Sequence, residues 1–195
     1  MKLANTKTEY TLIRSARRSI GIEIAPDGAV IVRAPRFATV RQIEALLAEK
    51  AGWIERARAT ARARTEAAEA AGVLSPEERK ALAMKAKAYL PGRVAYYAAL
   101  LGVTYGRITV RCQKTRWGSC SAQGNLNFNC LLMLTPPEVI DSVVVHELCH
   151  RKHMDHSPAF YAEVLRVFPD YKKWHAWLKR SGPVLLARVR EGEKE

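Results

Sequence analysis

Hydrophobic and polar residues alternate in the first third of the chain. Isoleucine or valine occupies every second position in residues 20–25 and again in residues 30–33. The intervening Pro26-Asp27-Gly28 is typical of a tight turn, because proline presets φ and glycine accepts positive φ. The pattern predicts a β-hairpin over residues 20–34, preceded by an extended stretch that starts at Tyr10.

The period changes to that of a helix near residue 40. Apolar residues recur at helical spacing in residues 43–54, and a continuation rich in alanine, arginine and glutamate extends to about Ala71. Thr39 is placed to cap this helix and Gly72 to end it. We therefore predict one long helix, whose second half connects an N-terminal sheet to the rest of the chain.

A second helix is predicted to begin at Ser75-Pro76, a capping residue followed by proline at the first turn. Pro91-Gly92 should kink or split it before it ends near Gly102. After a β section, the remaining chain has helical patterning. Three helices are predicted there, over residues 137–152, 158–168 and 170–180.

The β section covers residues 107–134. Apolar residues alternate with polar ones in residues 107–112, and with asparagines in residues 125–130. The whole pattern predicts an α+β fold with an antiparallel sheet in its C-terminal part. We expect two domains, residues 1–72 with the small N-terminal sheet and residues 73–195 with the candidate chemistry.

Composition places the chain among folded proteins. Its 195 residues are 48% hydrophobic and 26% charged, which argues against a disordered chain. The longest uncharged apolar run, Val94 to Val103, is too short to span a bilayer, and the polar N-terminus does not resemble a signal peptide. The four cysteines form no CxxC pair, and we expect them to be reduced, with the protein in the cytoplasm.

The net charge of +13 raises the possibility of a nucleic-acid partner. The densest basic stretch comprises Arg56, Arg58, Arg62 and Arg64, interleaved mainly with alanines. This spacing is more typical of a solvated helix face than of a phosphate-binding patch. The charge alone does not identify a function.

The strongest chemical signal is the H-E-x-x-H pattern of His146, Glu147 and His150. On a helix, the two histidines lie one turn apart on the same face, and the glutamate flanks that face. Two imidazoles so placed can bind one zinc ion, and the carboxylate can accept a proton from water. The motif predicts a metal site with Glu147 as general base.

A catalytic zinc needs a third protein ligand. His153 is a poor candidate, because two helical turns would place it about 10 Å from His146. His156 is favoured, since Ser157-Pro158 directly after it predicts a new helix and hence a turn of the chain. Glu163 on that next helix remains an alternative ligand.

The chain resembles the YgjP-like metallopeptidase domain family, bacterial cytoplasmic zincins related to the SprT-like and WLM proteins. The segments that carry the resemblance are KTRWGSC at 114–120, NLNFN at 125–129, VVHELCH at 144–150, and His156-Ser157 with Phe160. It implies a zincin-like C-terminal core and one zinc ion bound by His146, His150 and His156, with Glu147 as catalytic base. The chain departs from the family at Tyr161, where a tryptophan is common.

The resemblance to metallopeptidases implies peptide or protein substrates. Arg116, Asn127 and Tyr161 are candidate substrate-binding residues, and an extended peptide could add a strand along residues 125–129. Arg116, Tyr161 and His153 are also candidates for stabilising an oxyanion. Trp117 is more simply a core residue beside a turn at Gly118.

Two other functions remain open. The basic surface could belong to a nucleic-acid-associated protein, either with structural zinc or with protease activity on DNA-bound targets. A non-proteolytic metal hydrolase is less favoured, because no second metal centre is recognisable. A membrane partner is not expected. His175, between Trp174 and Trp177, is interpreted as a packed or surface histidine.

Overall fold

The computed structural model describes residues 8–189. The chain divides into two compact units, residues 1–70 and residues 71–195. Each unit has its own sheet and its own helices, in keeping with the predicted α+β class. The two units are described separately below.

The first unit contains a three-stranded sheet of β1 (Thr11–Ser15), β2 (Gly21–Ile24) and β3 (Val30–Pro35). The central strand β3 pairs antiparallel with β2 and parallel with β1. The predicted hairpin is therefore confirmed, with Ile22 opposite Val32. Its turn requires Gly28, whose φ of 85° lies in the left-handed region that glycine accepts without strain.

Two helices complete this unit, α1 (Val40–Glu49) and α2 (Ala51–Ala71). Thr39 caps α1 through a reciprocal capping box with Gln42, as its position predicted. The single predicted helix is nevertheless broken at Lys50, whose ψ of 7° departs from the helical value. The apolar positions keep helical spacing across this residue, so the pattern does not reveal the bend.

The second unit begins with α3 (Pro76–Leu101). Ser75 forms a capping box with Glu78, and Gly102 ends the helix with a φ of 66°. Pro91 lies inside α3, which continues without a break, so of the predicted kink or split the split does not occur. Leu90 and Val94 on either side are fully buried, and this packing holds the helix together where proline removes a backbone donor.

The sheet of this unit consists of β4 (Ile108–Arg111), β5 (Gly118–Cys120) and β6 (Leu126–Asn129). Its order is β4-β6-β5, with β6 antiparallel to β5 and parallel to β4. The sheet is thus mixed rather than antiparallel. The reason is that the chain turns twice between β4 and β6, so that β6 runs in the direction of β4.

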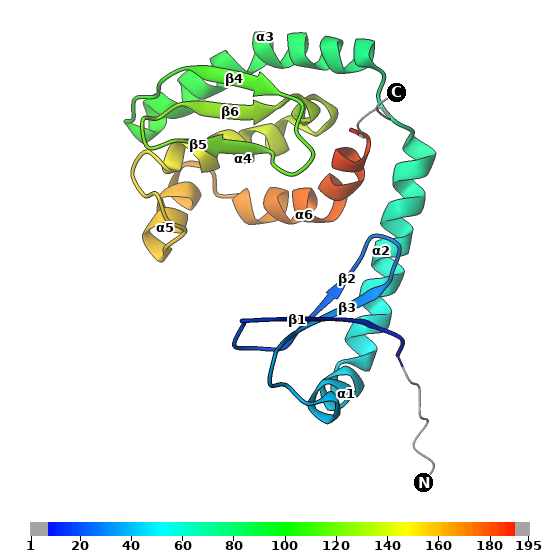
Figure 1. Cartoon of the computed structure of the whole chain (residues 1–195). Coiled ribbons are helices and arrows are strands. Elements are labelled where there is room, and N and C mark those ends of the chain that lie inside the picture. The colour runs from blue at the N-terminus through cyan, green and yellow to red at the C-terminus, as the bar shows by residue number, and fades with distance from the viewer. Residues whose placement is uncertain (1–7, 190–195) are drawn as a thin grey trace. The chain divides into compact units, whose positions relative to one another are not determined.

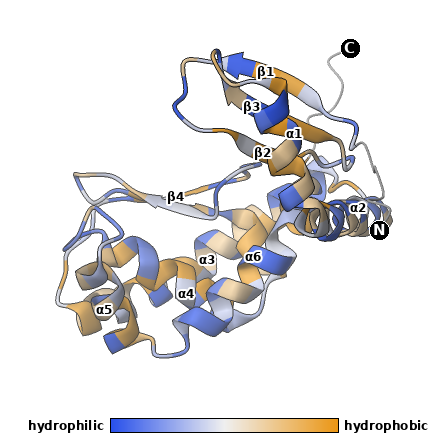
Figure 2. Cartoon of the chain, turned by 90° about the horizontal axis from the view of Figure 1, so that it is seen from below, coloured by the Kyte–Doolittle hydropathy of each residue, from blue (hydrophilic) through white to orange (hydrophobic). Residues whose placement is uncertain are grey.

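A short 3-10 helix η1 (Cys130–Leu134) leads to α4 (Pro137–Cys149), α5 (Pro158–Val167) and α6 (Tyr171–Ala187). Helix α4 lies beside α3 and contacts β5 (Figure 1). Hydrophobic residues gather where α3, α4 and α6 come together (Figure 2). Buried residues from β6, α3 and α4, among them Phe128, Leu90 and Val144, form one core, and this core fixes the position of α4.

Cys112 and Cys130 form a disulfide, with their Cα atoms 5.4 Å apart. The expectation that all cysteines are reduced is wrong for this pair; Cys120 and Cys149 are free. The pairing follows from sheet register, because Arg111 and Asn129 are partners in the β4–β6 ladder and the cysteines come next on each strand. Because of this disulfide, the cysteines no longer support the expectation that the protein resides in a reducing compartment.

Within residues 8–189, no helix combines the length and the apolar character needed to cross a membrane.

Candidate metal centre

Helix α4 packs one face against the core and carries candidate metal ligands on the opposite face. Its first turn starts at Pro137, a residue suited to that position, and carries Glu138 at the positive helix end. Val144, Val145 and Leu148 are fully buried and anchor the helix against the rest of the unit. The opposite face is left to His146 and, at the end of the helix, His150.

Three histidines converge here. His146, His150 and His156 each offer a ring nitrogen, and these nitrogens lie within 4.8 Å of one another. Nε2 of His156 is 3.1 Å from Nε2 of His146. Zn–N bonds of about 2.0–2.1 Å in tetrahedral geometry separate ligand nitrogens by about 3.3 Å. The spacing of this pair matches two ligands of one metal ion, and the three nitrogens form a candidate metal-binding set.

The turn after α4 brings His156 to this place. His150 ends the helix, and the chain re-enters a helix at Ser157, whose side chain caps α5 by accepting from the backbone N–H of Phe160. The buried ring of Phe160 packs about 5 Å from each of the three histidine rings. The predicted turn at Ser157-Pro158 is confirmed.

Hydrogen bonds orient two of the rings. His150 donates its Nδ1–H to the backbone carbonyl oxygen of His153, at 3.0 Å, which leaves Nε2 free as a ligand atom. Nδ1 of His146 lies 2.9 Å from the hydroxyl oxygen of Tyr171, and this hydroxyl is 3.2 Å from Nδ1 of His175. Such outer contacts set the tautomer and direction of a metal-binding imidazole.

Burial disfavours protonation of two of the rings, those of His146 and His150. Desolvation, followed by the neighbouring His150 and His156, lowers the pKa of His146 to about 3. The pKa of His150 is also lowered, chiefly by burial. Because a metal ion binds the neutral imidazole, this environment favours metal over protons.

Glu147 is buried, with 6% of its surface exposed, and burial raises the pKa of its carboxyl to about 8. It lies against the backbone of β5. A Cβ atom added to Gly118 would come within 2.7 Å of Oε1 of Glu147. Glycine at this position therefore makes room for the carboxylate.

A cavity of about 250 Å³ adjoins these groups. Its lining includes His146 and Glu147 from α4, Arg116 and Trp117 from the loop before β5, and apolar residues such as Leu178. His175 also lines it, and it is not among the three histidines whose nitrogens converge. No sequence motif marks Tyr171 or His175; only the approach of α6 to α4 brings them to the site.

The other candidate residues differ in their surroundings. Tyr161 is 38% exposed, and its ring centroid is 6.3 Å from that of His156. Asn127 lies on β6 and donates from Nδ2 to the hydroxyl oxygen of Ser119. Because β6 is the central strand, the prediction that a peptide adds along residues 125–129 is wrong; β5 is the edge strand nearest to α4.

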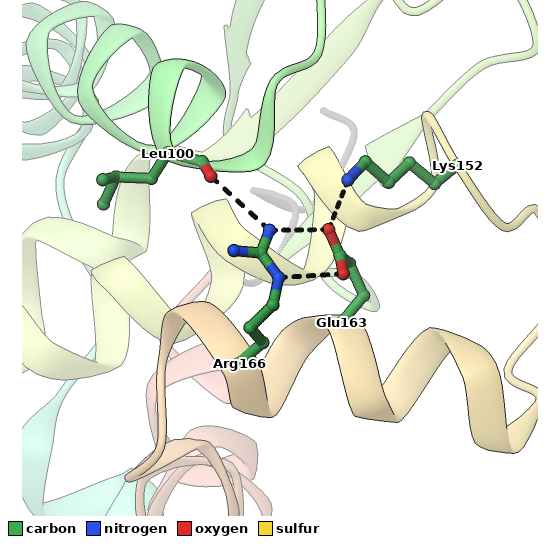
Figure 3. A network of polar contacts seen from close by, with 4 residues as sticks. All are labelled: Leu100, Lys152, Glu163 and Arg166. Atoms are coloured by element: carbon green, nitrogen blue, oxygen red, sulfur yellow. Dashed lines mark hydrogen bonds and ion pairs between the residues drawn. The ribbon is translucent and has the colours of Figure 1, made fainter.

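Glu163, the alternative third ligand, forms ion pairs outside the cluster of three histidines. Its carboxylate pairs with Lys152 and Arg166, and Arg166 also donates to the carbonyl oxygen of Leu100 (Figure 3). Arg166 and Lys152 lower the pKa of Glu163 to about 2. The alternative in which Glu163 is the third ligand has no support in this geometry.

Comparisons with known proteins place the chain in a family. The model of the YgjP-like metallopeptidase domain family matches residues 18–82 and 74–181. Two metallopeptidase zymogens are among the similar solved structures, abylysin from Pyrococcus abyssi and jannalysin from Methanocaldococcus jannaschii. Each has a TM-score of 0.42 and covers 46% of this chain. The abylysin structure is 22% identical and 91% of its chain is covered, and the jannalysin structure is 19% identical and 92% of its chain is covered. No curated protein matches the chain.

Proposed function

The chain belongs to the YgjP-like metallopeptidase family, and from this premise we propose that it hydrolyses peptide bonds with one zinc ion. His146, His150 and His156 hold the ion, and Glu147 is the general base. The convergence of three histidine nitrogens within 4.8 Å carries the proposal. The buried carboxylate next to His146 in the chain supports the assigned base.

Zinc, when bound, supplies a Lewis acid that polarises the substrate carbonyl and lowers the pKa of water toward about 7. Glu147 accepts the proton of the attacking water and then delivers it to the leaving amine. Glu147 is buried and directly follows the candidate ligand His146 on α4, which supports this role.

The proposal includes contacts between the protein and its peptide substrate. An extended peptide adds to the free edge of β5, which lies against Glu147 through Gly118. Arg116 and Tyr161 contact the substrate on the cavity side and near His156, respectively. Asn127 acts through its hydrogen bond to Ser119 on the edge strand.

Zinc analysis of protein purified without a histidine tag tests the ligand set. We expect one zinc per chain, and a large loss of zinc in His156→Ala. His153→Ala is the matched control, because the hydrogen bond from His150 to His153 uses the backbone carbonyl, which alanine keeps. A His156→Ala protein that keeps its zinc would remove His156 from the ligand set.

Glu147→Gln tests the base separately. This variant should keep the zinc ion and lose hydrolysis of a peptide library, since the amide cannot accept the proton of water. Turnover at the wild-type rate would refute the assigned role.

A further inference from the structure

A second cavity shares Arg116 with the cavity beside Glu147. It has a volume of about 640 Å³, and we call it the basic cavity. Its lining includes Arg79 from the first turns of α3, together with Lys114 and Arg116 from the loop between β4 and β5. Among residues 8–189, no aspartate or glutamate lines it.

The loop that forms this cavity is held in place. Nδ2 of the buried Asn129 donates to two carbonyl oxygens of the loop, those of Gln113 at 2.7 Å and Arg116 at 2.8 Å. The disulfide to Cys130 anchors the start of the loop at Cys112. The backbone that carries Lys114 and Arg116 is thus positioned in advance of any ligand, which reduces the entropy cost of binding.

Arg79 supplies the half-buried guanidinium group of the basic cavity, and Arg116 supplies an exposed one. Nε of Arg79 is buried without a hydrogen-bond partner, and neither Arg79 nor Arg116 has an ion pair in the part of the chain that is described. By contrast, Arg93 of the same unit forms a paired contact with both oxygens of Asp141. A buried donor without an acceptor is costly, and a carboxylate is the geometric match of a guanidinium.

We propose that the basic cavity binds a carboxylate of the peptide substrate, so that the enzyme selects peptides with an acidic group near the bond that is cut. This inference rests on the proposed peptidase function, because Arg116 connects the basic cavity to the cavity beside Glu147. The carboxylate comes either from an aspartate or glutamate side chain or from the C-terminus of the substrate. The high net charge of the chain also attracts acidic segments.

The first experiment digests a library of short random peptides with the zinc-loaded wild-type protein and reads the cleaved bonds by mass spectrometry. We expect enrichment of aspartate and glutamate at a defined position, or cleavage at a defined distance from the C-terminus. A cleaved peptide is then compared with its Glu→Gln form and with its C-terminal amide, which separates the two sources of the carboxylate. The acidic form should have a kcat/KM at least about tenfold higher.

Variants of the basic cavity should remove this selectivity. In Arg79→Gln and in Arg116→Gln, the ratio of kcat/KM for the acidic and amide peptides should fall toward one, while Arg79→Lys retains part of it. Lys80→Gln is the matched control, because it removes one positive charge at the next position of α3, outside the cavity lining. A wild-type ratio near one, or a ratio that Arg79→Gln and Arg116→Gln leave unchanged, would overturn the proposal.

A binding measurement separates this inference from the proposed activity. Glu147→Gln protein is incubated with the same library, and the retained peptides are identified. Enrichment of acidic peptides that disappears in Glu147→Gln/Arg79→Gln supports the carboxylate site even if the wild type cuts nothing. Retention without acidic enrichment would refute the proposal. If, in that case, Glu147→Gln/Lys80→Gln binds a single-stranded DNA oligonucleotide and Glu147→Gln/Arg79→Gln does not, the cavity is assigned to phosphate instead.

Discussion

The hydroxyl oxygen of Tyr171 lies 2.9 Å from Nδ1 of His146 and thereby directs Nε2 of this histidine toward His156. The two residues come from different helices, α6 and α4. The hydroxyl is also within 3.2 Å of His175, so one phenol connects a candidate metal ligand to the wall of the cavity. Outer contacts of this kind hold a ligand ring in its binding orientation.

Tyr171→Phe should therefore weaken metal binding. We expect a zinc affinity about 10- to 100-fold lower, because the His146 ring loses its orienting partner. Competition with a chromogenic chelator measures the affinity directly. Tyr161→Phe is the control, since Tyr161 lies beside His156 without a hydrogen bond to any of the three histidines in the described chain. Equal zinc affinities in the two variants would contradict this role of Tyr171.

Gly118→Ala should impair catalysis without removing the metal. The added methyl group would meet Oε1 of Glu147 at 2.7 Å and Cγ at 2.8 Å, so the carboxylate must move. A displacement of about 1 Å at a reacting group can cost about 100-fold in rate. We expect kcat/KM to fall by about that factor at unchanged zinc content.

The control for Gly118→Ala is Gly92→Ala on α3, where a new Cβ has no neighbour within 4 Å. That change should leave activity intact and raise the free energy of unfolding by about 0.5–1 kcal/mol, since alanine is the better helix former. Full activity of Gly118→Ala would show that Glu147 needs no space at β5.

Glu163→Gln should change stability in a pH-dependent way and leave zinc content unchanged. The pKa of Glu163 is lowered from 4.5 to about 2, first by Arg166 and then by Lys152. A lowered folded-state pKa means that the carboxylate contributes stability at pH values above the unfolded value of 4.5, and that this contribution is lost as the pH falls toward 2.

Urea unfolding of wild type and Glu163→Gln at several pH values measures this contribution. We expect a difference of about 1 kcal/mol at neutral pH, as for a partly exposed ion pair, and converging curves below pH 4.5. Glu69→Gln, which alters an exposed glutamate of α2, is the control for the loss of one negative charge. A loss of zinc in Glu163→Gln would restore Glu163 as a ligand candidate.

Reduction of the Cys112–Cys130 disulfide should destabilise the second unit. The bond closes a loop between cysteines 18 residues apart, and loop-closure entropy of this size corresponds to about 3 kcal/mol. The midpoint of urea unfolding should fall in dithiothreitol and in Cys112→Ser, but not in Cys120→Ser. Mass spectrometry of unreduced tryptic peptides identifies the pair, and free thiols at both positions would exclude it.

Local patterns account for much of what could be predicted. The alternation in residues 20–34 predicts the hairpin, and the helical pattern of residues 137–152 predicts α4, which ends at Cys149. Both depend on neighbours a few positions apart, whose relation the backbone geometry of a strand or helix fixes. The capping boxes at Thr39 and Ser75 are predictable for the same reason.

The sequence-based predictions were wrong where the structure depends on contacts between segments far apart in the chain. The helix continues through Pro91 because Leu90 and Val94 are buried in the core, and this packing is not encoded in local spacing. The second sheet is mixed because β6 pairs with β4, although β5 lies between these two strands in the sequence. The same pairing aligns Cys112 with Cys130, although no cysteine motif marks them.

The sequence by itself determined that His146, Glu147 and His150 share one helix and that the chain turns before Ser157, since helix periodicity and capping chemistry act over a few residues. The tertiary structure alone decided that Tyr171 supports His146, that Gly118 makes room for Glu147, and that Arg116 joins two cavities. These contacts bring together residues far apart in the chain, and they exist only because a common hydrophobic core packs α4, α6 and the sheet into one arrangement.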